Sequence, residues 1–384
     1  MDVVYLDYAA TTPAAKEVID TMIQYFAGVY GNPSSTHALG NEARQALEEA
    51  RATIARYIGA RRDEVFFTSG GSEANNTALK GIAFANRHRG EHIIVSSIEH
   101  HSILEACLFL EEQGFRVTYL PVDRHAWVSP NDVEKAITDK TILISVMHAN
   151  NEVGTIEPIT EIGRIAKEKE VYFHTDAVQT LGHIPVDVND LSTDLLSASA
   201  HKLYGPKGVG LLYVRRGVKI SPLIHGGDQE GDLRAGTENV AGIVGFAKAA
   251  EVAEREYDKE ARELVRLREM LTDGLIGIGG VHLNGHPDYR LSGNVNVTID
   301  GADGEDLLLD LRLEGICASN GSACNSVKTR PSHVLVAMGL SPTAARSSLR
   351  FTMGRQTRES DVENLLDVMP SVVTRCRRNY NPYI

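Results

Sequence analysis

The chain has 384 residues, more than one hydrophobic core usually holds, because single cores stop growing near about 250–300 residues. Acidic residues outnumber basic ones by 51 to 39, and the formal charge of −12 disfavours nucleic acid and anionic membranes as partners. No apolar run approaches the about 20 residues of a membrane-spanning helix, and residues 1–7 lack the parts of a signal peptide, so we expect a cytoplasmic protein.

Short β-rich segments alternate with helical patterns between residues 64 and 214. The expected strands are 64–70, 92–97, 116–122, 141–150, 171–177, 193–200 and 208–214. The expected helices, with apolar positions at helical spacing, are 72–88, 101–114, 129–138 and 159–170. This alternation predicts an α/β fold with a mostly parallel sheet covered by helices on both faces. Ligands of such sheets collect at the carboxyl ends of the strands.

The pattern changes beyond the glycine-rich stretch 225–239. A long helical stretch from about 240 to 275 has the character of a connector. The segments that follow mix strands and helices as a smaller α+β unit does, over 292–300, 305–315, 316–319, 347–354 and 358–376. We therefore predict a large domain of residues 15–256, and a small domain that combines residues 1–14 with residues 257–384.

The four cysteines, Cys107, Cys317, Cys324 and Cys376, have neither CxxC spacing nor the density of a disulfide scaffold, which predicts reduced thiols. Cys107 lies in a helical pattern and is expected to be buried and structural. Cys324 lies in a polar, glycine-bearing loop, which suits a thiol that must move. A redox pair of Cys317 with Cys324 is an alternative, because sequence spacing does not fix their separation.

Asp176 ends one expected strand, and Lys202 follows the end of the next, 202 − 176 = 26 residues later. One βα crossover fits that gap, so both side chains are expected in the same crevice. A simple ion pair is the alternative. The small residues around the lysine, in "SASAHKLYGPKGVG", leave room for a ligand beside the amine.

Pyridoxal phosphate fits that room, because its aldehyde needs an amine, its pyridine nitrogen a carboxylate and its phosphate backbone N–H donors. The phosphate seat would be "TSGGSEANN", residues 68–76, where a strand turns through two glycines into a helix N-terminus. A tight turn without a ligand would have the same pattern. His100, after the strand at 92–97, is expected to stack on the cofactor ring and to move protons. A surface or metal-bound histidine is the alternative, but no HExxH or cysteine cluster supports a metal site.

A set of short segments spans essentially the whole chain. They are "YLDYAATTP", "GNPSSTHALG", "TSGGSEANN", "IEHHSILE", "HANNEVGTIEPI", "HTDAVQTLGHIPVDV", "ASAHKLYGPKGVG", "LRAGTEN", "ASNGSACNS", "RPSHVLVAMGL" and "SSLRFTMGR". Together they resemble the cysteine desulfurases of the NifS/IscS type, pyridoxal-phosphate enzymes of the class V aminotransferase family. The cysteine loop separates this branch from aminotransferases that share the fold.

The resemblance implies fold type I of the pyridoxal-phosphate-dependent transferases and a role for each matching residue. Lys202 would bind the cofactor covalently, Asp176 would hold the pyridine nitrogen, His100 would stack on the ring and Gln179 would contact the phenolic oxygen. The residues that match the phosphate site are Gly71, Ser72, Ser199 and His201. Thr237 matches a residue that reaches the phosphate of the neighbouring subunit, which implies a homodimer.

The resemblance also implies the reaction. Asn151 and Arg350 would hold the substrate carboxylate, and the planar fork of an arginine suits that task. L-cysteine would become L-alanine, with its sulfur left as a persulfide on Cys324. The sulfur would pass to an acceptor such as an iron–sulfur scaffold protein or to another thiolation pathway. Because little of an ordinary thiol is ionised at pH 7, the step needs thiolate stabilisation or a proton acceptor, for which His100 is the candidate.

Two regions depart from the family pattern. Asp228, Gly231 and Asp232 interrupt a run that is usually glycine-rich, and we expect these carboxylates to face solvent. Lys328 and Arg330 are basic where acidic or neutral residues are common. Two alternatives stay open: an aminotransferase of the same fold, in which Cys324 has no role, and an inactive scaffold for sulfur assembly.

Overall fold

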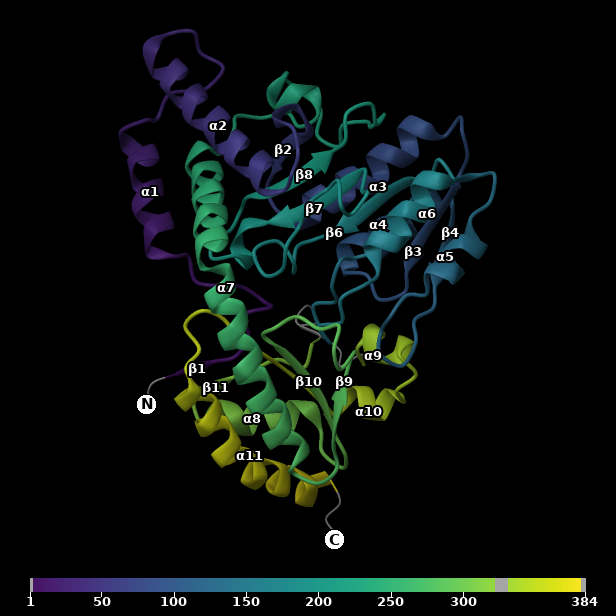
Figure 1. Cartoon of the computed structure of the whole chain (residues 1–384), viewed down its shortest axis with the longest axis vertical. Helices are drawn as coiled ribbons and strands as arrows, with labels where there is room; N and C mark the ends of the chain where they lie inside the picture. Colours follow the sequence, from purple (N-terminus) through teal and green to yellow (C-terminus); the bar gives the residue numbers. More distant parts are fainter. Residues whose placement is uncertain (1–2, 322–330, 381–384) are drawn as a thin grey trace.

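A seven-stranded sheet forms the centre of the larger part of the molecule (Figure 1). The computed structural model describes residues 3–321 and 331–380. The strand order is β2-β8-β7-β6-β5-β3-β4, and every pairing except those of β8 is parallel. The strands are β2 (Val65–Thr68), β3 (His92–Ser96), β4 (Arg116–Leu120), β5 (Thr141–Ser145), β6 (Tyr172–Asp176), β7 (Leu195–Ser199) and β8 (Gly210–Val214). The mostly parallel α/β sheet expected from the sequence is confirmed.

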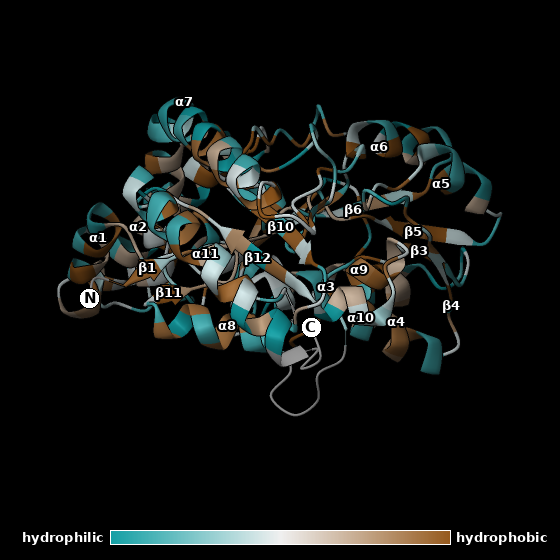
Figure 2. Ribbon diagram, turned by 90° about the horizontal axis from the view of Figure 1, so that it is seen from below, coloured by the Kyte–Doolittle hydropathy of each residue, from teal (hydrophilic) through white to brown (hydrophobic). Residues whose placement is uncertain are grey.

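Helices cover both faces of this sheet. They are α1 (Lys16–Ala27), α2 (Ala38–Tyr57), α3 (Gly71–Asn86), α4 (His101–Glu112), α5 (Pro130–Ala136), α6 (Ile159–Glu168) and the first half of α7 (Val240–Ile276). Successive strand residues face opposite sides, so Ile94 packs in the core under α2, α6 and α7, whereas Ile93 and Val95 pack in the core under α3 and α4. Strands β3 and β5 are accordingly buried throughout and have hydrophobic residues at their centres, whereas α6 and α7 contain both hydrophobic and hydrophilic residues along their length (Figure 2).

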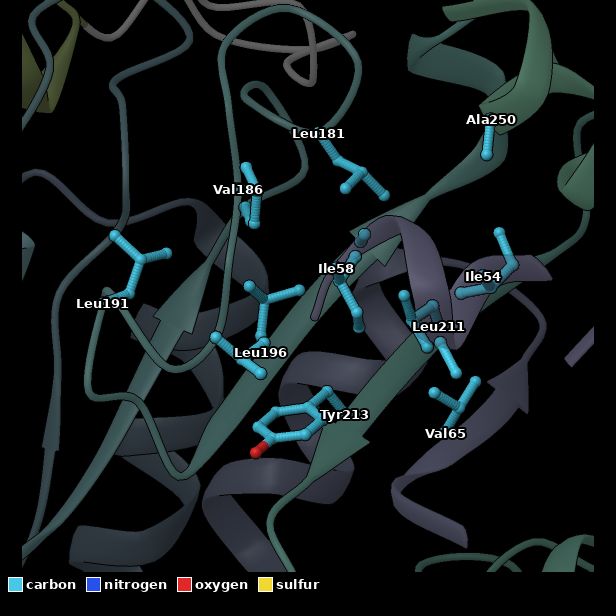
Figure 3. Packing of buried hydrophobic residues seen from close by; sticks show 14 of the residues in the cluster. Ile54, Ile58, Val65, Leu181, Val186, Leu191, Leu196, Leu211, Tyr213 and Ala250 are labelled. Atoms are coloured by element: carbon cyan, nitrogen blue, oxygen red, sulfur yellow. The ribbon is translucent and has the colours of Figure 1, made fainter. Parts of the chain in front are cut away.

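The core on the α2 side brings together residues from distant parts of the chain. Ile54 and Ile58 from α2 and its end lie beside Val65, Leu196 and Leu211 of three strands, and Figure 3 shows how these side chains pack. Each fully buried side chain of this kind contributes roughly 1.5–3 kcal/mol relative to an exposed one.

The smaller part contains a three-stranded antiparallel sheet in the order β12-β10-β9 and a separate parallel pair, β1 with β11. Its strands are β1 (Val4–Tyr5), β9 (Val281–Asn284), β10 (Asn294–Ile299), β11 (Ile316–Cys317) and β12 (Ser348–Thr352). Its helices are α8 (Gly304–Leu313), α9 (His333–Ala337), α10 (Pro342–Arg346) and α11 (Glu359–Tyr380). Short 3-10 turns also occur in the larger part, at η1 (Arg62–Glu64), η2 (Ala200–Lys202) and η3 (Gln229–Asp232).

Helix α7 runs from the larger part into the smaller part (Figure 1). Its residues up to Ala253 pack in the core of the large sheet, and those from Leu264 onward pack with Val4 and Leu6 in the core of the small one. The domain boundaries between residues 14 and 15 and between residues 256 and 257 stay a prediction. Within the described ranges, none of the helices combines the length and the apolar composition that crossing a bilayer requires.

Candidate active site

The carboxyl ends of two adjacent strands bring the predicted acid and amine to one edge of the sheet. β6 ends at Asp176 and β7 ends at Ser199, and Asp176 pairs in register with Ser197. The 3-10 turn η2 follows β7 directly and carries Lys202 as its last residue. Parallel strands end at the same edge of a sheet, which is why a spacing read from the sequence places these side chains together.

The carboxylate of Asp176 is buried and hydrogen-bonded. Its Oδ2 accepts from Nδ2 of Asn75 at 2.7 Å, and its Oδ1 accepts from the backbone N–H of Val178 at 2.9 Å. Hydrogen bonds from the protein therefore hold both carboxylate oxygens in place. Asn75, on α3, is a site residue that the sequence analysis did not single out, although it lies within the motif at 68–76.

The N-terminal segment, residues 7–12, passes along the same edge of the sheet. Nζ of Lys202 donates to the carbonyl oxygen of Ala9, and to that of Ala10 at 2.8 Å. Nε2 of Gln179 donates to the same Ala9 oxygen at 3.1 Å. Lys202 and Gln179 therefore share one acceptor. The motif "YLDYAATTP", which the sequence analysis used only for the resemblance, is thus part of the site.

His201 also contacts the N-terminal segment. Its Nδ1 lies 3.1 Å from Oγ1 of Thr11, and its carbonyl oxygen accepts from the N–H and the hydroxyl of Thr12. Burial, aided by the positive charges of Lys202 and Lys207, lowers the pKa of His201 to about 4. The ring is therefore neutral at pH 7 and recognises its neighbours by hydrogen bonds.

The N-terminus of α3 provides the expected anion seat. Its first helical residue is Gly71, and no side chain caps the helix, so its first N–H groups are left for a ligand. Gly70 has φ 156° and ψ 178°, a conformation almost restricted to glycine. A Cβ on Gly71 would lie 2.6 Å from Cγ2 of Val178, which requires glycine where the helix approaches the sheet edge. Ser72 is exposed, and Ser199 is buried at the end of β7.

An ion pair connects this seat to the loop that carries Thr237. Nε of Arg234 lies 3.0 Å from Oε1 of Glu73, whose Oε2 accepts from the N–H of Ser69 at 2.8 Å. Thr237 itself is exposed in the single chain. Asp228 and Asp232 are exposed too, as expected for carboxylates that face solvent, and so is Gly231.

His100 caps the N-terminus of α4. Its Nδ1 accepts from the backbone N–H of Ser102 at 3.2 Å and lies 2.9 Å from the Ser102 hydroxyl oxygen. Because Nδ1 is the acceptor, the neutral ring carries its proton on Nε2. Burial lowers the pKa of His100, the charge of Asp176 raises it and that of Lys202 lowers it. The charges of Asp176 and Lys202 therefore both act on the His100 ring.

The structure also brings together the two residues expected at the substrate carboxylate. Arg350, on β12, has a side chain only 2% exposed, and its Nη1 donates to the backbone oxygen of Asn151 at 3.0 Å. Its Nη2 forms an ion pair with Oδ1 of Asp7 at 2.7 Å. Its buried Nε has no hydrogen-bond partner within the described ranges.

Three residues with predicted or noted roles, Cys324, Lys328 and Arg330, lie outside the described residues. Of the other cysteines, Cys107 and Cys376 are buried and Cys317 is exposed. The predicted structural role of Cys107 agrees with its burial in the core under α3 and α4. The described part of the chain contains no group of His, Cys, Asp and Glu side chains that could hold a metal ion.

These features fit pyridoxal phosphate. A buried carboxylate with two donors, an amine at the next strand end and an uncapped, glycine-lined helix N-terminus occupy one edge of the sheet. They match the three chemical demands of the cofactor. Fold and site together define a fold-type-I transferase that depends on pyridoxal phosphate.

Comparison with known proteins agrees. The profile of the family described as Aminotransferase class-V matches residues 4–365. A protein of Methanosarcina thermophila named "Cysteine desulfurase IscS" is 54% identical over 379 residues, which cover 99% of this chain and 94% of that protein. A solved "NIFS-LIKE PROTEIN" superposes with a TM-score of 0.92 at 39% identity, covering 97% of this chain and all of the other. Another, "SspA in complex with cysteine", gives a TM-score of 0.82 at 40% identity and covers 91% and 98% of the two chains. The chain belongs to the class-V aminotransferase family, in the branch of the NifS/IscS-type cysteine desulfurases.

Proposed function

We propose that this chain is a pyridoxal-phosphate-dependent cysteine desulfurase, which converts L-cysteine to L-alanine and keeps the sulfur as a persulfide on Cys324. The observation that carries the proposal is the placement of Asp176 and Lys202 at adjacent strand ends, beside the uncapped N-terminus of α3. The names of the relatives and the cysteine complex of a solved neighbour support the choice of substrate.

The bound cofactor supplies an electron sink that stabilises negative charge on the substrate Cα. Lys202 would hold it covalently, Asp176 would keep its pyridine nitrogen protonated and Gln179 would contact its phenolic oxygen. The remaining contacts are assigned to Gly71, Ser72, Ser199 and His201 at the phosphate and to His100 at the ring. With the substrate bound, the Lys202 amine would remove the Cα proton.

Arg350 would bind the substrate carboxylate, with Asn151 holding the guanidinium through its backbone oxygen. The buried Nε without a partner supports this role, because an unsatisfied buried donor is costly unless a ligand completes it. Asp7 already occupies Nη2, so the substrate must share the guanidinium with Asp7 or displace it.

The sulfur transfer balances without an outside oxidant or reductant. The thiolate of Cys324 forms an S–S bond with the substrate sulfur, and the Cβ–S bond of the substrate breaks. The electron pair of the broken bond stays on the carbon fragment, whose Cβ gains one proton before L-alanine leaves.

The tautomer of His100 bears on the proton transfers. With Nδ1 engaged by the N–H of Ser102, the neutral ring offers a proton at Nε2 and accepts one only at Nδ1, after that hydrogen bond has opened. We therefore expect His100 to donate a proton more readily than to accept one. Acceptance of a proton from the Cys324 thiol was the role predicted from the sequence.

We further propose a homodimer in which Thr237 reaches the phosphate site of the partner subunit. Thr237 is exposed in the single chain. Helix α1 also exposes an apolar row, with Ile19, Ile23 and Phe26 at 47%, 61% and 68% exposure, which a second subunit would cover. Mixing the Lys202→Ala and Thr237→Ala variants tests this. Mixed dimers regain activity if Thr237 acts on the partner and stay inactive if it acts within its own chain.

The sulfur acceptor, such as an iron–sulfur scaffold protein, and the cytoplasmic location stay predictions from the sequence. The decisive experiment for the function compares Cys324→Ala with Cys317→Ala, both loaded with cofactor. We expect the first to keep the cofactor absorbance but to form neither persulfide nor alanine with multiple turnovers, and the second to behave as the wild type. Full turnover in Cys324→Ala would instead identify an aminotransferase-like reaction.

A further inference from the structure

Thr12, in the N-terminal segment, contacts the turn that carries Lys202 on both sides of the lysine. Thr12 is buried, and its hydroxyl donates to the carbonyl oxygen of His201 at 2.9 Å. The same hydroxyl accepts from the N–H of Tyr204 at 2.9 Å, and the N–H of Thr12 donates to the His201 oxygen at 3.0 Å. One hydroxyl group therefore holds the residue before Lys202 and the second residue after it.

The turn that Thr12 holds is strained at Tyr204. The φ of Tyr204 is 63°, in the left-handed region that few non-glycine residues adopt. Such a conformation persists only where the surroundings fix it, and it is commonest at functional sites. The carbonyl oxygen of Tyr204 accepts from the N–H of Ala15 at 2.9 Å, and its hydroxyl oxygen accepts from the N–H of Arg355 at 2.5 Å. Hydrogen bonds from residues near the N-terminus therefore hold both the N–H and the carbonyl group of the strained residue.

The N-terminal segment also accepts hydrogen bonds from the amine itself. Nζ of Lys202 donates to the carbonyl oxygens of Ala9 and Ala10, which closely precede Thr12 in the chain. A third segment holds the main chain of the lysine, because Nε2 of His183 lies 2.8 Å from the carbonyl oxygen of Lys202. Thr12 therefore fixes the acceptors of the amine relative to the turn that carries the amine.

The local sequence restricts Thr12 itself. Its β-branched side chain has few favourable χ1 rotamers. Thr12 also precedes Pro13, and a residue before proline is confined to extended backbone. The hydroxyl is therefore directed at the turn before any ligand binds.

We propose that Thr12 is a positioning residue for Lys202, whose hydroxyl ties both sides of the lysine to the N-terminal segment and so sets the place of the amine. This inference rests on the proposed function, because it takes Lys202 as the residue that binds the cofactor and removes the Cα proton. A small displacement of a reacting group costs about 100-fold in rate, so Thr12 should matter for both steps without touching the cofactor or the substrate.

The test compares two variants of the full chain loaded with pyridoxal phosphate. Thr12→Val keeps the shape of the side chain without the hydroxyl, whereas Thr12→Ser keeps the hydroxyl. Thr193→Val is the matched control, because Thr193 is buried too and its hydroxyl contacts the carbonyl oxygens of Phe173 and Leu195 at 3.0 and 2.7 Å. Thr193 precedes β7, whereas Lys202 follows it, so the two sites lie at opposite ends of one strand.

Three measurements are made on each protein. Hydride reduction at equal concentrations of enzyme and cofactor, followed by mass spectrometry, gives the fraction of Lys202 that carries the cofactor. Alanine formation gives kcat, and thermal unfolding gives the stability. We expect Thr12→Val to lower the tagged fraction and to lower kcat about 10- to 100-fold. Thr12→Ser should restore most of both, and Thr193→Val should match the wild type in both even where its stability falls.

Wild-type tagging and kcat in Thr12→Val overturn the proposal. Equal losses in Thr12→Val and Thr12→Ser overturn it too, because the hydroxyl is then not the group that matters. So does a loss in Thr193→Val as large as that in Thr12→Val, which would follow stability alone. If Thr12→Val does not fold, Thr12→Ala takes its place in the comparison with Thr12→Ser. A wild-type enzyme in which hydride reduction tags another lysine and leaves Lys202 untagged contradicts the proposed function instead.

Discussion

Arg350 and Asp7 form an ion pair across 343 residues of sequence, with Nη2 and Oδ1 2.7 Å apart. The pair connects β12 to the N-terminal segment, at the guanidinium that is expected to bind the substrate carboxylate. The chain therefore supplies a carboxylate of its own at this position. Asp7 is therefore expected to affect the affinity of the enzyme for its substrate.

Replacing Asp7 by asparagine should lower the KM for L-cysteine, because the substrate carboxylate no longer shares Arg350 with an internal anion. Ion pairs with one partly exposed partner are worth up to about 1 kcal/mol, which corresponds to a factor of about 2–5. Steady-state alanine formation measures the effect. Asp20→Asn, which removes an exposed partner of Lys16, serves as the control and should leave the KM unchanged. A rise in KM for Asp7→Asn would show that Asp7 orients the arginine rather than competes with the substrate.

Hydride reduction of the holoenzyme should attach the cofactor covalently to Lys202. Lys202 lies in η2, directly after β7, and its positive charge lowers the pKa of His100 while the charge of Asp176 raises it. Mass spectrometry of a digest identifies the tagged peptide. Lys202→Ala should remain untagged, whereas Lys207→Ala, which changes an exposed lysine of the same loop, should be tagged normally. A tag on any lysine other than Lys202 would contradict the assignment.

Glu99 should make the protein less stable as the pH rises. Its carboxyl is fully buried, Oε1 accepts from the Ser96 hydroxyl and the Met147 N–H, and burial raises its pKa to about 8. The folded state then holds a proton that the unfolded state releases near pH 4.5, so this carboxyl opposes folding increasingly between about pH 4.5 and 8. A pKa difference of one corresponds to about 1.4 kcal/mol.

Glu99→Gln removes this titration. Relative to the wild type, its midpoint of thermal unfolding should therefore be higher at pH 8.5 than at pH 5 by several degrees, since 1 kcal/mol shifts Tm by about 2 °C in a chain of this size. The exposed Glu112→Gln should show no such difference. Equal effects of Glu99→Gln at both pH values would mean that Glu99 is ionised in the folded protein at neutral pH.

The buried pair of Arg51 and Glu230 should be among the most sensitive positions for stability. The two guanidinium–carboxylate contacts measure 2.7 and 2.9 Å, and the N–H of Phe67 donates to the same carboxylate. Glu230→Ala leaves the buried Arg51 guanidinium with the half-exposed Glu48 as its remaining carboxylate partner, and should cost about 3–5 kcal/mol in the free energy of unfolding. Denaturant unfolding measures it.

The exposed pair of Glu263 with Arg266 provides the comparison, and Glu263→Ala should cost less than about 1 kcal/mol. Glu230 lies in the loop that leads to Thr237, so Glu230→Ala should also weaken cofactor binding by the dimer. A variant as stable as the wild type would show that the loop is held by other contacts.

The sequence by itself determined the alternation of strands and helices in the large sheet and the placement of Asp176 and Lys202. Both follow from local rules, since side-chain periodicity marks strands and helices, and parallel strands end at one edge of the sheet. The sequence patterns predicted no helix within residues 16–57, which form α1 and α2. They also extended the expected strand at 141–150 beyond Ser145, where the chain leaves the sheet.

Only the tertiary structure decided which distant segments complete the site. Ala9 and Ala10 meet Lys202 from 193 and 192 residues away, Asp7 pairs with Arg350, and Glu152 contacts Ser332 across 180 residues. Such contacts leave no periodic pattern in the sequence, because each depends on how two separate cores pack around α7 and on backbone carbonyls that every residue carries.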